Sequence, residues 1–279
     1  MHPTLHYILW NPDIWALHIG HFGLRWYSLL WCLALFSAYL IVQRLYRHQH
    51  IPDKLFDPLF LYCFVGILIG ARLGHCLFYE PHYFLAHPLE MILPMRHTPA
   101  GWVFTGYAGL ASHGGTLGLI IALLIYVKRT KLNIMRVLDN VALSAPAASM
   151  FIRLGNLMNS EIIGKPTNVP WAFIFQRVDM LPRHPGQLYE ALAYLIIFII
   201  GILIYRQQPH KVGTGYYFGY CIATIYTARF FLEYTKDVQV AWEEGMIFNM
   251  GQLLSLPFII IGFYCMAGGK LCKRFGEQK

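Results

Sequence analysis

Long apolar segments, separated by short polar stretches, recur along the whole chain. Seven of them are long enough to cross a bilayer as helices, which takes roughly 17–25 apolar residues. These segments are Leu24–Gln43, Asp57–Phe78, Trp102–Val127, Ile134–Met158, Gln187–Tyr205, Gly213–Glu233 and Met250–Ala267. Turn-forming or charged residues such as Ile51-Pro52-Asp53-Lys54 separate them. The pattern predicts an all-α integral membrane protein, a bundle of about seven transmembrane helices.

The composition supports this fold class. The chain has 279 residues, of which 57% are hydrophobic and 13% charged, whereas a soluble domain carries about 25% charged residues. No stretch is left for a separate soluble domain, so we expect a single polytopic membrane domain over residues 1–279. Residues 1–20 lack the basic flank and unbroken apolar core of a cleaved signal peptide. Trp10 and Trp15 instead favour an N-terminal segment at the membrane interface.

The cysteines and the net charge exclude several other classes. The six cysteines show no CxxC pair and no metal-type spacing with histidines, so we expect neither a disulfide framework nor a metal site. The formal net charge of +8 comes without a nucleic-acid-binding motif, and we expect no nucleic-acid partner.

The positive charge is a topology signal. One set of loops, including the basic tail 268–279, holds 12 of the 22 Lys and Arg residues, and the opposite set holds five. Because Lys and Arg accumulate in cytoplasmic loops, the richer side is predicted to be cytoplasmic. The N-terminus then lies outside and the C-terminus lies in the cytoplasm.

Polar side chains recur inside these apolar segments. With this orientation and a rise of about 1.5 Å per residue, six spans place polar residues in the outer third of the bundle. These residues are Tyr27, Arg72, Arg153, Asn156, Gln187, Glu190, Arg229, Glu233 and Gln252. A charge at mid-bilayer costs at least ~2.5–3.5 kcal/mol, so the set predicts an internal cavity open to the outer side. His113 lies deeper, about 16 Å from the outer surface if the third span is a continuous helix.

Most of these residues also have a purely structural interpretation. Arg229 and Glu233 are four residues apart and could neutralise each other, and Arg72 could pair with a carboxylate or extend outward. Tyr27 suits an interfacial aromatic, and Glu161 a cap of the external loop. His113 could bond a backbone carbonyl. The neighbouring glycines could form flexible backbone around a cavity or allow tight helix packing. They are Gly114, Gly115 and Gly118.

The strongest local signal is the stretch from Arg153 to Gly164, which places a cation, amides and a carboxylate at one helix end. It resembles the signature of the prolipoprotein diacylglyceryl transferase family. Five further stretches agree in the order that this family shows, and the resemblance runs from Ile14 to Ile261. They are Arg25–Tyr27, Gly70–Gly74, His113–Gly115, His184–Glu190, and Arg229–Glu233 followed by Gly251 and Gln252.

The resemblance implies transfer of a diacylglyceryl group from phosphatidylglycerol to the lipobox cysteine thiol of a prolipoprotein. A thioether forms and glycerol 1-phosphate leaves, which is the first step of bacterial lipoprotein maturation. It further implies a multi-pass protein of the bacterial cytoplasmic (inner) membrane, with its active site toward the outer face. The partners are phosphatidylglycerol, the lipobox segment and the bilayer, and no cofactor is expected.

The resemblance also implies roles for individual residues. Arg153 and Arg229 suit the lipid phosphate, because guanidinium groups form planar, charge-assisted hydrogen bonds. His113 suits a general base for the thiol or a group that orients the lipid, and both roles stay open. Expected catalytic residues are His113, Arg153, Arg229 and Tyr27. Expected substrate-binding residues are Arg153, Asn156, Glu161, Gly164, Arg229, Glu233, Arg72, Gly114, Gly115, Glu190 and Gln252.

The chain departs from the family at two places. Just before His113 it has Ala111-Ser112, where the family is expected to have a serine and an aromatic residue. The family usually has a tyrosine four residues before the arginine of its last outward span, where this chain has Ile225 followed by Tyr226. Two alternative functions remain at this stage: a transporter with buried charge pairs and another phospholipid headgroup transferase. The sequence shows no internal repeat between its halves, which disfavours the transporter.

Overall fold

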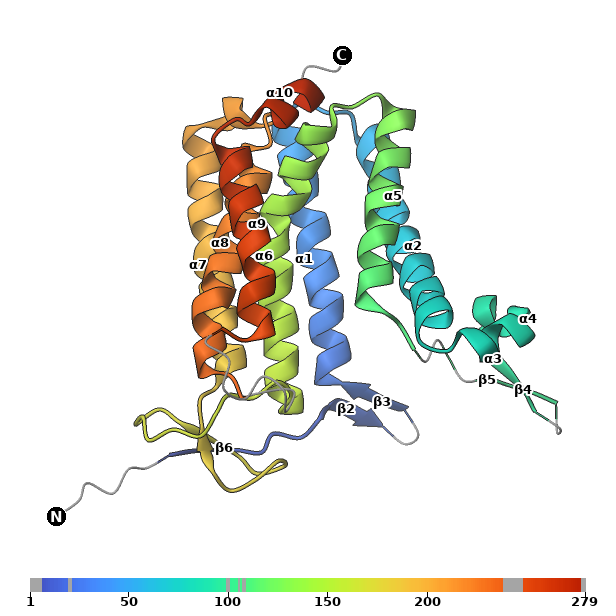
Figure 1. The fold of residues 1–279 in the computed structure, drawn as a ribbon, viewed down its shortest axis with the longest axis vertical. Coiled ribbons are helices and arrows are strands. Elements are labelled where there is room, and N and C mark those ends of the chain that lie inside the picture. Colours follow the sequence, from blue (N-terminus) through green and yellow to red (C-terminus); the bar gives the residue numbers. More distant parts are fainter. Residues whose placement is uncertain are drawn as a thin grey trace. The chain divides into compact units, whose positions relative to one another are not determined.

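The computed structural model describes residues 7–19, 22–98, 101–104, 106, 109–237 and 248–276. Residues 1–6 and 20 of the predicted interfacial segment, and 277–279 of the predicted basic tail, lie outside the described residues. The chain divides into two compact units (Figure 1). Unit 1 comprises Met1–Leu45 and Leu138–Gln278, and unit 2 comprises Tyr46–Val137 with Lys279. A single polytopic domain stays a prediction.

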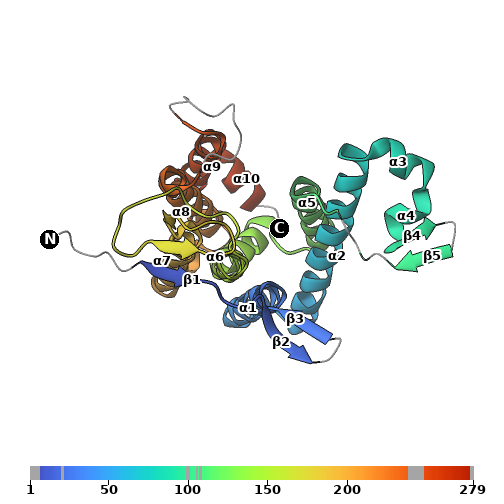
Figure 2. The same cartoon turned by 90° about the horizontal axis from the view of Figure 1, so that it is seen from below.

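Unit 1 contains most of α1 and α6, together with α7 to α10. Helix α8 packs against both α7 and α9, and Figure 2 shows these helices end on. The helices are α1 (Trp26–His48), α6 (Ile134–Asn159), α7 (Gly186–Gln207), α8 (Tyr216–Leu232), α9 (Met250–Met266) and α10 (Lys270–Gly276). Short 3₁₀ turns follow α7 and α8, at Pro209–Lys211 and Glu233–Thr235.

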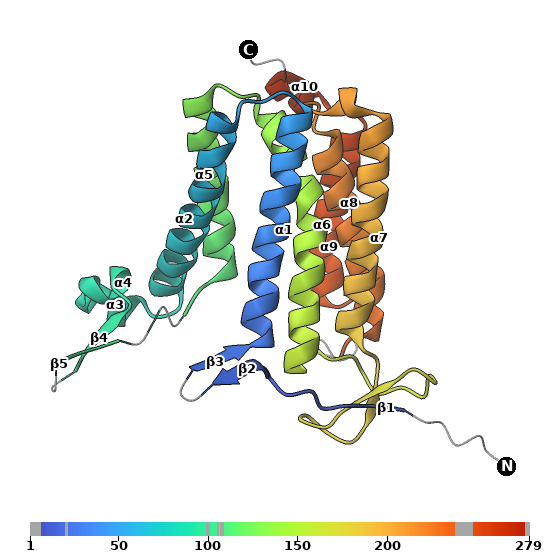
Figure 3. The same cartoon turned by 180° about the vertical axis from the view of Figure 1, so that it is seen from behind.

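Short strands close one end of unit 1. Strand β1 (Ile8–Trp10) pairs in parallel with β6 (Phe173–Phe175), and β7 (Pro182–Arg183) pairs antiparallel with β6. Strands β2 (Trp15–Ile19) and β3 (Phe22–Arg25) form a hairpin that leads into α1. In Figure 3, β1 lies at the end of the bundle where α6 ends and α7 begins. The Trp10 Nε1–H donates to the Leu157 carbonyl at 2.9 Å, which fastens β1 to the end of α6.

Unit 2 is built on α2 (Asp53–Phe78) and α5 (Ser112–Thr130). Between them lie α3 (Pro81–Ala86), α4 (Pro88–Ile92) and the hairpin β4 (Met95–Thr98) and β5 (Gly101–Phe104). A Cβ on Gly114 would lie 2.2 Å from the Gly70 carbonyl oxygen, and one on Gly118 would lie 2.0 Å from that of Gly66. The two backbones therefore touch through glycine, and the packing interpretation of Gly114 and Gly118 is confirmed.

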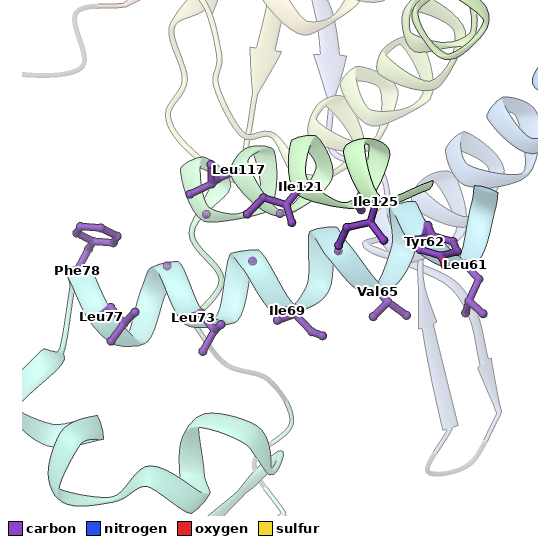
Figure 4. Close-up of a pocket in the computed structure, with 16 residues that line it drawn as sticks. Leu61, Tyr62, Val65, Ile69, Leu73, Leu77, Phe78, Leu117, Ile121 and Ile125 are labelled. Carbon is purple, nitrogen blue, oxygen red and sulfur yellow. The ribbon is translucent and has the colours of Figure 1, made fainter. Parts of the chain in front are cut away.

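An apolar groove of about 700 Å³ runs along α2 and α5. In Figure 4 its labelled side chains are almost all aliphatic or aromatic, with the Tyr62 hydroxyl as the exception. Among the described residues, no carboxylate, imidazole, thiol or cationic side chain lines it. The groove therefore has the character of a surface for hydrocarbon and lacks the groups that the predicted chemistry needs.

The start of the third predicted span is wrong. Residues Gly101–Phe104 form a strand, and α5 begins only at Ser112. Positive φ angles at Gly101, Gly106 and Gly109 (113°, 68° and 83°) interrupt any helix before that point. His113 thus lies in the first turn of a regular helix, so the flexible backbone expected around it is wrong. The predicted depth of about 16 Å assumed a continuous third span, and that condition is not met.

Four described helices are long and apolar enough to cross a membrane: α1, α2, α6 and α7. Helices α9 and α10, which meet at a bend of 59°, would supply a fifth if they form one span. The seven predicted segments all coincide with described helices, apart from the start of the third. The fold is therefore mostly helical with four or five candidate spans, while seven spans and their orientation stay predictions.

Helix α7 shows a reversed amphipathic pattern. Its exposed face carries Leu192, Ile196, Ile199, Ile200 and Leu203, which recur at helical spacing. Its buried face begins with the polar side chains of Gln187 and Glu190, which are both fully buried. A helix in water shows the opposite arrangement, so the apolar face suits lipid and the polar groups suit the interior.

The carboxylate of Asp139, near the start of α6, orders the beginning of α8. Its oxygens accept from the backbone N–H groups of Gly213 (2.8 Å), Gly215 (3.1 Å) and Phe218 (2.8 Å). The first N–H groups of a helix have no partner within the helix, and Asp139 supplies one from a distant segment.

Asp139→Asn should destabilise the protein by about 1.5–3 kcal/mol, because hydrogen bonds to an ionised acceptor contribute about that much. The amide keeps the shape of the side chain and loses the charge and one acceptor oxygen. Thermal unfolding in detergent measures the loss. Asp57→Asn, at an exposed carboxylate on α2, is the matched control, and equal melting temperatures for the two variants would contradict the role given to Asp139.

Candidate functional site

An alternating chain of charges lies at the end of unit 1 where α6 ends and α7 begins. The Arg153 Nε lies 2.7 Å from Glu190 Oε2, and the Lys236 Nζ lies 2.9 Å from Glu190 Oε1. The same Nζ lies 3.0 Å from Glu233 Oε2. Glu190 is fully buried, and Glu233 and Lys236 are each 7% exposed. Charges buried to this extent require partners, and each of these has at least one.

Arg229 stands beside this chain of charges and has no counter-ion among the described residues. Among the described residues it makes no ion pair or hydrogen bond, since the carboxylate of Glu233 is taken by Lys236. The suggested neutralisation of Arg229 by Glu233 is therefore wrong. Tyr194, one turn after Glu190 on α7, interacts electrostatically with both Arg153 and Arg229. The two guanidinium groups thus face a common neighbour.

Amide side chains continue the network at the end of α6. The Arg153 Nη1 lies 3.5 Å from Asn156 Oδ1, and the Asn156 Nδ2 donates to Glu161 Oε2 at 3.1 Å. The Asn159 Nδ2 donates to the other Glu161 oxygen, also at 3.1 Å. The chain turns sharply here through the left-handed conformation of Ser160 (φ 56°). Glu161 thus braces this turn, which confirms the structural role suggested for it.

Tyr27, in the first turn of α1, lies against this part of α6. A Cβ on Gly155 would lie 3.0 Å from the Tyr27 ring, and the Trp31 Nε1–H donates to the Tyr27 hydroxyl at 3.2 Å. Gly155 directly precedes Asn156, so the absence of a side chain there lets the phenol approach the network.

Gly164 and Gln252 have packing roles. A Cβ on Gly164 would lie 2.4 Å from the His184 carbonyl oxygen, so only glycine fits. Gln252, 2% exposed, exchanges hydrogen bonds with Asn249 in a capping box and donates to the Phe230 carbonyl at 3.2 Å. Their predicted contact with substrate stays a prediction. Tyr226 also packs, since its ring stacks on Phe258 at 4.3 Å.

The remaining predicted residues belong to unit 2. Arg72 is buried and donates to the carbonyl oxygens of Glu90 (2.6 Å), Met91 (3.2 Å) and Gly109 (3.5 Å). These bonds tie the connection between α2 and α5 to α2. The burial of Arg72 and these bonds give it a structural role, while pairing with a carboxylate stays a prediction. His113 is exposed in the first turn of α5.

Gly115, also in unit 2, meets its nearest neighbour, Ala71 Cβ, at an ordinary 3.5 Å from a built Cβ. Unlike Gly114, it is not required by close packing. The structure thus divides the predicted set between the two units. Unit 1 carries Tyr27, Arg153, Asn156, Glu161, Gly164, Glu190, Arg229, Glu233 and Gln252, and unit 2 carries Arg72, His113, Gly114 and Gly115.

Two basic residues of the segments that connect the helices were missed as site residues. Lys236 was counted only as a loop charge, although its position three residues after Glu233 fits a local ion pair. Arg183 contacts Asp179 at 2.6 Å and Asp237 at 2.8 Å, and donates to the Gly164 carbonyl at 3.1 Å. The hydrogen bond from Arg183 lowers the pKa of the Asp179 carboxyl, so the Asp179–Arg183 ion pair remains charged at neutral pH.

The arrangement can bind an anion. A guanidinium group has five N–H donors in a planar fork, and Glu190 faces one of those of Arg153. Arg229 has no acceptor among the described residues. Guanidinium groups suit a phosphate oxyanion better than ammonium groups would, because the fork matches its geometry, and Arg153 and Arg229 both lie within electrostatic range of Tyr194.

The chain is similar to known proteins along nearly its whole length. The family model described as "Prolipoprotein diacylglyceryl transferase" matches residues 14–267. A phosphatidylglycerol–prolipoprotein diacylglyceryl transferase of Bacteroides fragilis is 55% identical over 260 residues, which cover 93% of this chain and 94% of the relative.

More distant relatives carry the same name. The protein of Chloroherpeton thalassium is 42% identical, with 93% of each chain covered. That of Tolumonas auensis is 39% identical, with 93% of this chain and 96% of the relative covered. The match extends over nearly all of both units, including the six motifs and the charged network at the end of α6. The chain therefore belongs to the prolipoprotein diacylglyceryl transferase family, a bacterial family of multi-pass membrane enzymes.

Proposed function

We propose that this chain transfers the diacylglyceryl group of phosphatidylglycerol to the lipobox cysteine of prolipoproteins, and that Arg153 and Arg229 bind the lipid phosphate. The names of the relatives supply the two substrates. The observation that carries the site is Arg229, a cation without a counter-ion among the described residues, beside the Arg153–Glu190 pair. Family membership disfavours both a transporter and a transferase with another acceptor.

The chemistry needs positive charge where the phosphate departs. The cysteine sulfur attacks the glyceryl carbon, a C–S bond forms, and the C–O bond to the phosphate breaks. The electron pair of that bond leaves with glycerol 1-phosphate, so negative charge grows on the phosphate oxygens. Donors already in place for this charge stabilise the transition state. The ion pair with Glu190 holds Arg153 in position for this role. Tyr27 and Asn156 can form hydrogen bonds with the lipid headgroup.

The thiol must lose its proton during the reaction. A free cysteine has a pKa near 8.5 and reacts as the thiolate, so a base assists at neutral pH. His113 can take this proton or can orient the lipid. Its exposed position in the first turn of α5 leaves the imidazole accessible to a substrate.

The site is proposed to face the outer side of the bacterial cytoplasmic membrane, with seven spans, the N-terminus outside and the C-terminus in the cytoplasm. The polar network lies where α1 and α7 begin and where α6 and α8 end. The basic residues of α10 lie at the opposite end of α9 from Gln252. Basic residues collect on the cytoplasmic side, which supports this orientation.

Arg153→Lys and Arg229→Lys should each reduce transfer at least about tenfold. A hydrogen bond to a charged group contributes about 1.5–3 kcal/mol, and about 1.4 kcal/mol corresponds to tenfold in rate. The assay incubates the purified enzyme with phosphatidylglycerol and a lipobox-cysteine peptide, and quantifies the thioether-linked product by mass spectrometry.

The control for this pair is Arg206→Lys, at an exposed arginine at the other end of α7. It should transfer at the normal rate. All three variants should insert into membranes normally. Near-normal transfer by both Arg153→Lys and Arg229→Lys would remove the proposed phosphate site.

His113→Gln should show whether His113 acts as the base. If it does, the activity lost near pH 7 should be partly recovered near pH 9, where a free thiol of pKa about 8.5 is already largely ionised. The measurement is the ratio of variant to parent activity across this pH range. The same ratio at every pH would rule out the base and leave lipid binding.

A further inference from the structure

Lys236 occupies an unusual environment for a lysine. Its side chain is 3% exposed and lies between the carboxylates of Glu190 and Glu233, at 2.9 Å and 3.0 Å. The surrounding backbone is fixed, since Lys236 forms a bridge with Gly164 and the Lys165 N–H donates to the Thr235 carbonyl at 2.9 Å. A lysine so far from solvent needs its counter-ions. Its side chain is also too buried to contact a substrate directly.

The two carboxylates differ in the ion-pair partners that they have besides Lys236. Glu190 also has Arg153, at 2.7 Å. Glu233 has only Lys236 as an ion-pair partner among the described residues. The next cation within reach of Glu233 along its own chain is Arg229, four residues earlier, which is the spacing of a helical ion pair.

We propose that Lys236 is a positioning residue that keeps Arg229 free for the substrate. By occupying Glu233, it prevents this carboxylate from pairing with Arg229. Lys236 also pairs with Glu190 and neutralises part of the negative charge of this carboxylate. Glu190 therefore offsets less of the positive charge of Arg153. This inference rests on the proposed function, in which the two arginines bind the phosphodiester of phosphatidylglycerol.

The proposal predicts a specific pattern of loss and recovery. In Lys236→Met, Glu233 loses its partner and turns to Arg229, so the KM for phosphatidylglycerol should rise tenfold or more. In the double variant Lys236→Met with Glu233→Gln, the competing carboxylate is gone as well. Arg229 is then free again, and the KM should return to within about threefold of that of Glu233→Gln alone. A loss of folding support would instead grow worse in the double variant.

The experiment measures kcat and KM for phosphatidylglycerol in mixed micelles, with a saturating lipobox-cysteine peptide, for both single variants and the double variant. Lys236→Arg, which keeps the charge, should retain most of the affinity. Lys165→Met is the matched control, because Lys165 is exposed in a neighbouring external segment, and its KM should be unchanged. Thermal unfolding of each variant checks that it is folded.

A folded double variant whose KM is as high as that of Lys236→Met would overturn the inference. This comparison holds even if Lys236→Met alone does not fold, because the double variant removes a buried cation together with its carboxylate and can be judged against Glu233→Gln. The proposed function is tested separately. If Arg229→Lys loses transfer while Lys236→Met keeps a normal KM, only the role of Lys236 fails; if Arg229→Lys is near normal, the phosphate site itself fails.

Discussion

The carboxylate of Glu190 is the contact on which the candidate site depends. It is fully buried on α7 and lies between Arg153 of α6 and Lys236, which follows α8. Three separate segments therefore meet at one side chain. An unpaired carboxylate in such a place would be very costly, and so would either cation without it. Because these buried charges must stay paired, the ion pairs fix the ends of α6, α7 and α8 relative to one another.

The same constraint explains why the network lies at helix ends. A helix within a bilayer satisfies its own backbone, so its sides can be apolar, as on the exposed face of α7. At the ends, backbone groups and loop residues supply extra donors and acceptors. The Glu161 carboxylate accepts from two amide side chains there, and the Gln187 side chain bonds its carbonyl. Polar chemistry thus collects where the helices begin and end.

Much of this could be predicted from the sequence, and the failures have physical causes. Apolar length alone located α1, α2, α6 and α7. It failed at the start of α5, because the residues before Ser112 are apolar while glycines with positive φ turn the chain. Charge spacing suggested Arg229, four residues earlier, as the partner of Glu233, whereas the structure pairs Glu233 with Lys236, three residues later. Lys236 was overlooked because it was counted only among the basic residues of the loops. Such a count does not distinguish a buried lysine from an exposed one.

The glycine contact between α2 and α5 has a consequence for His113. Gly114 meets Gly70 and Gly74 backbone to backbone, so no flexible side chain lies between the helices to absorb a change. The close contact with α2 therefore fixes the position of His113, the residue just before Gly114, relative to α2. A larger residue at Gly70 or Gly74 would therefore displace a histidine about forty positions away along the chain.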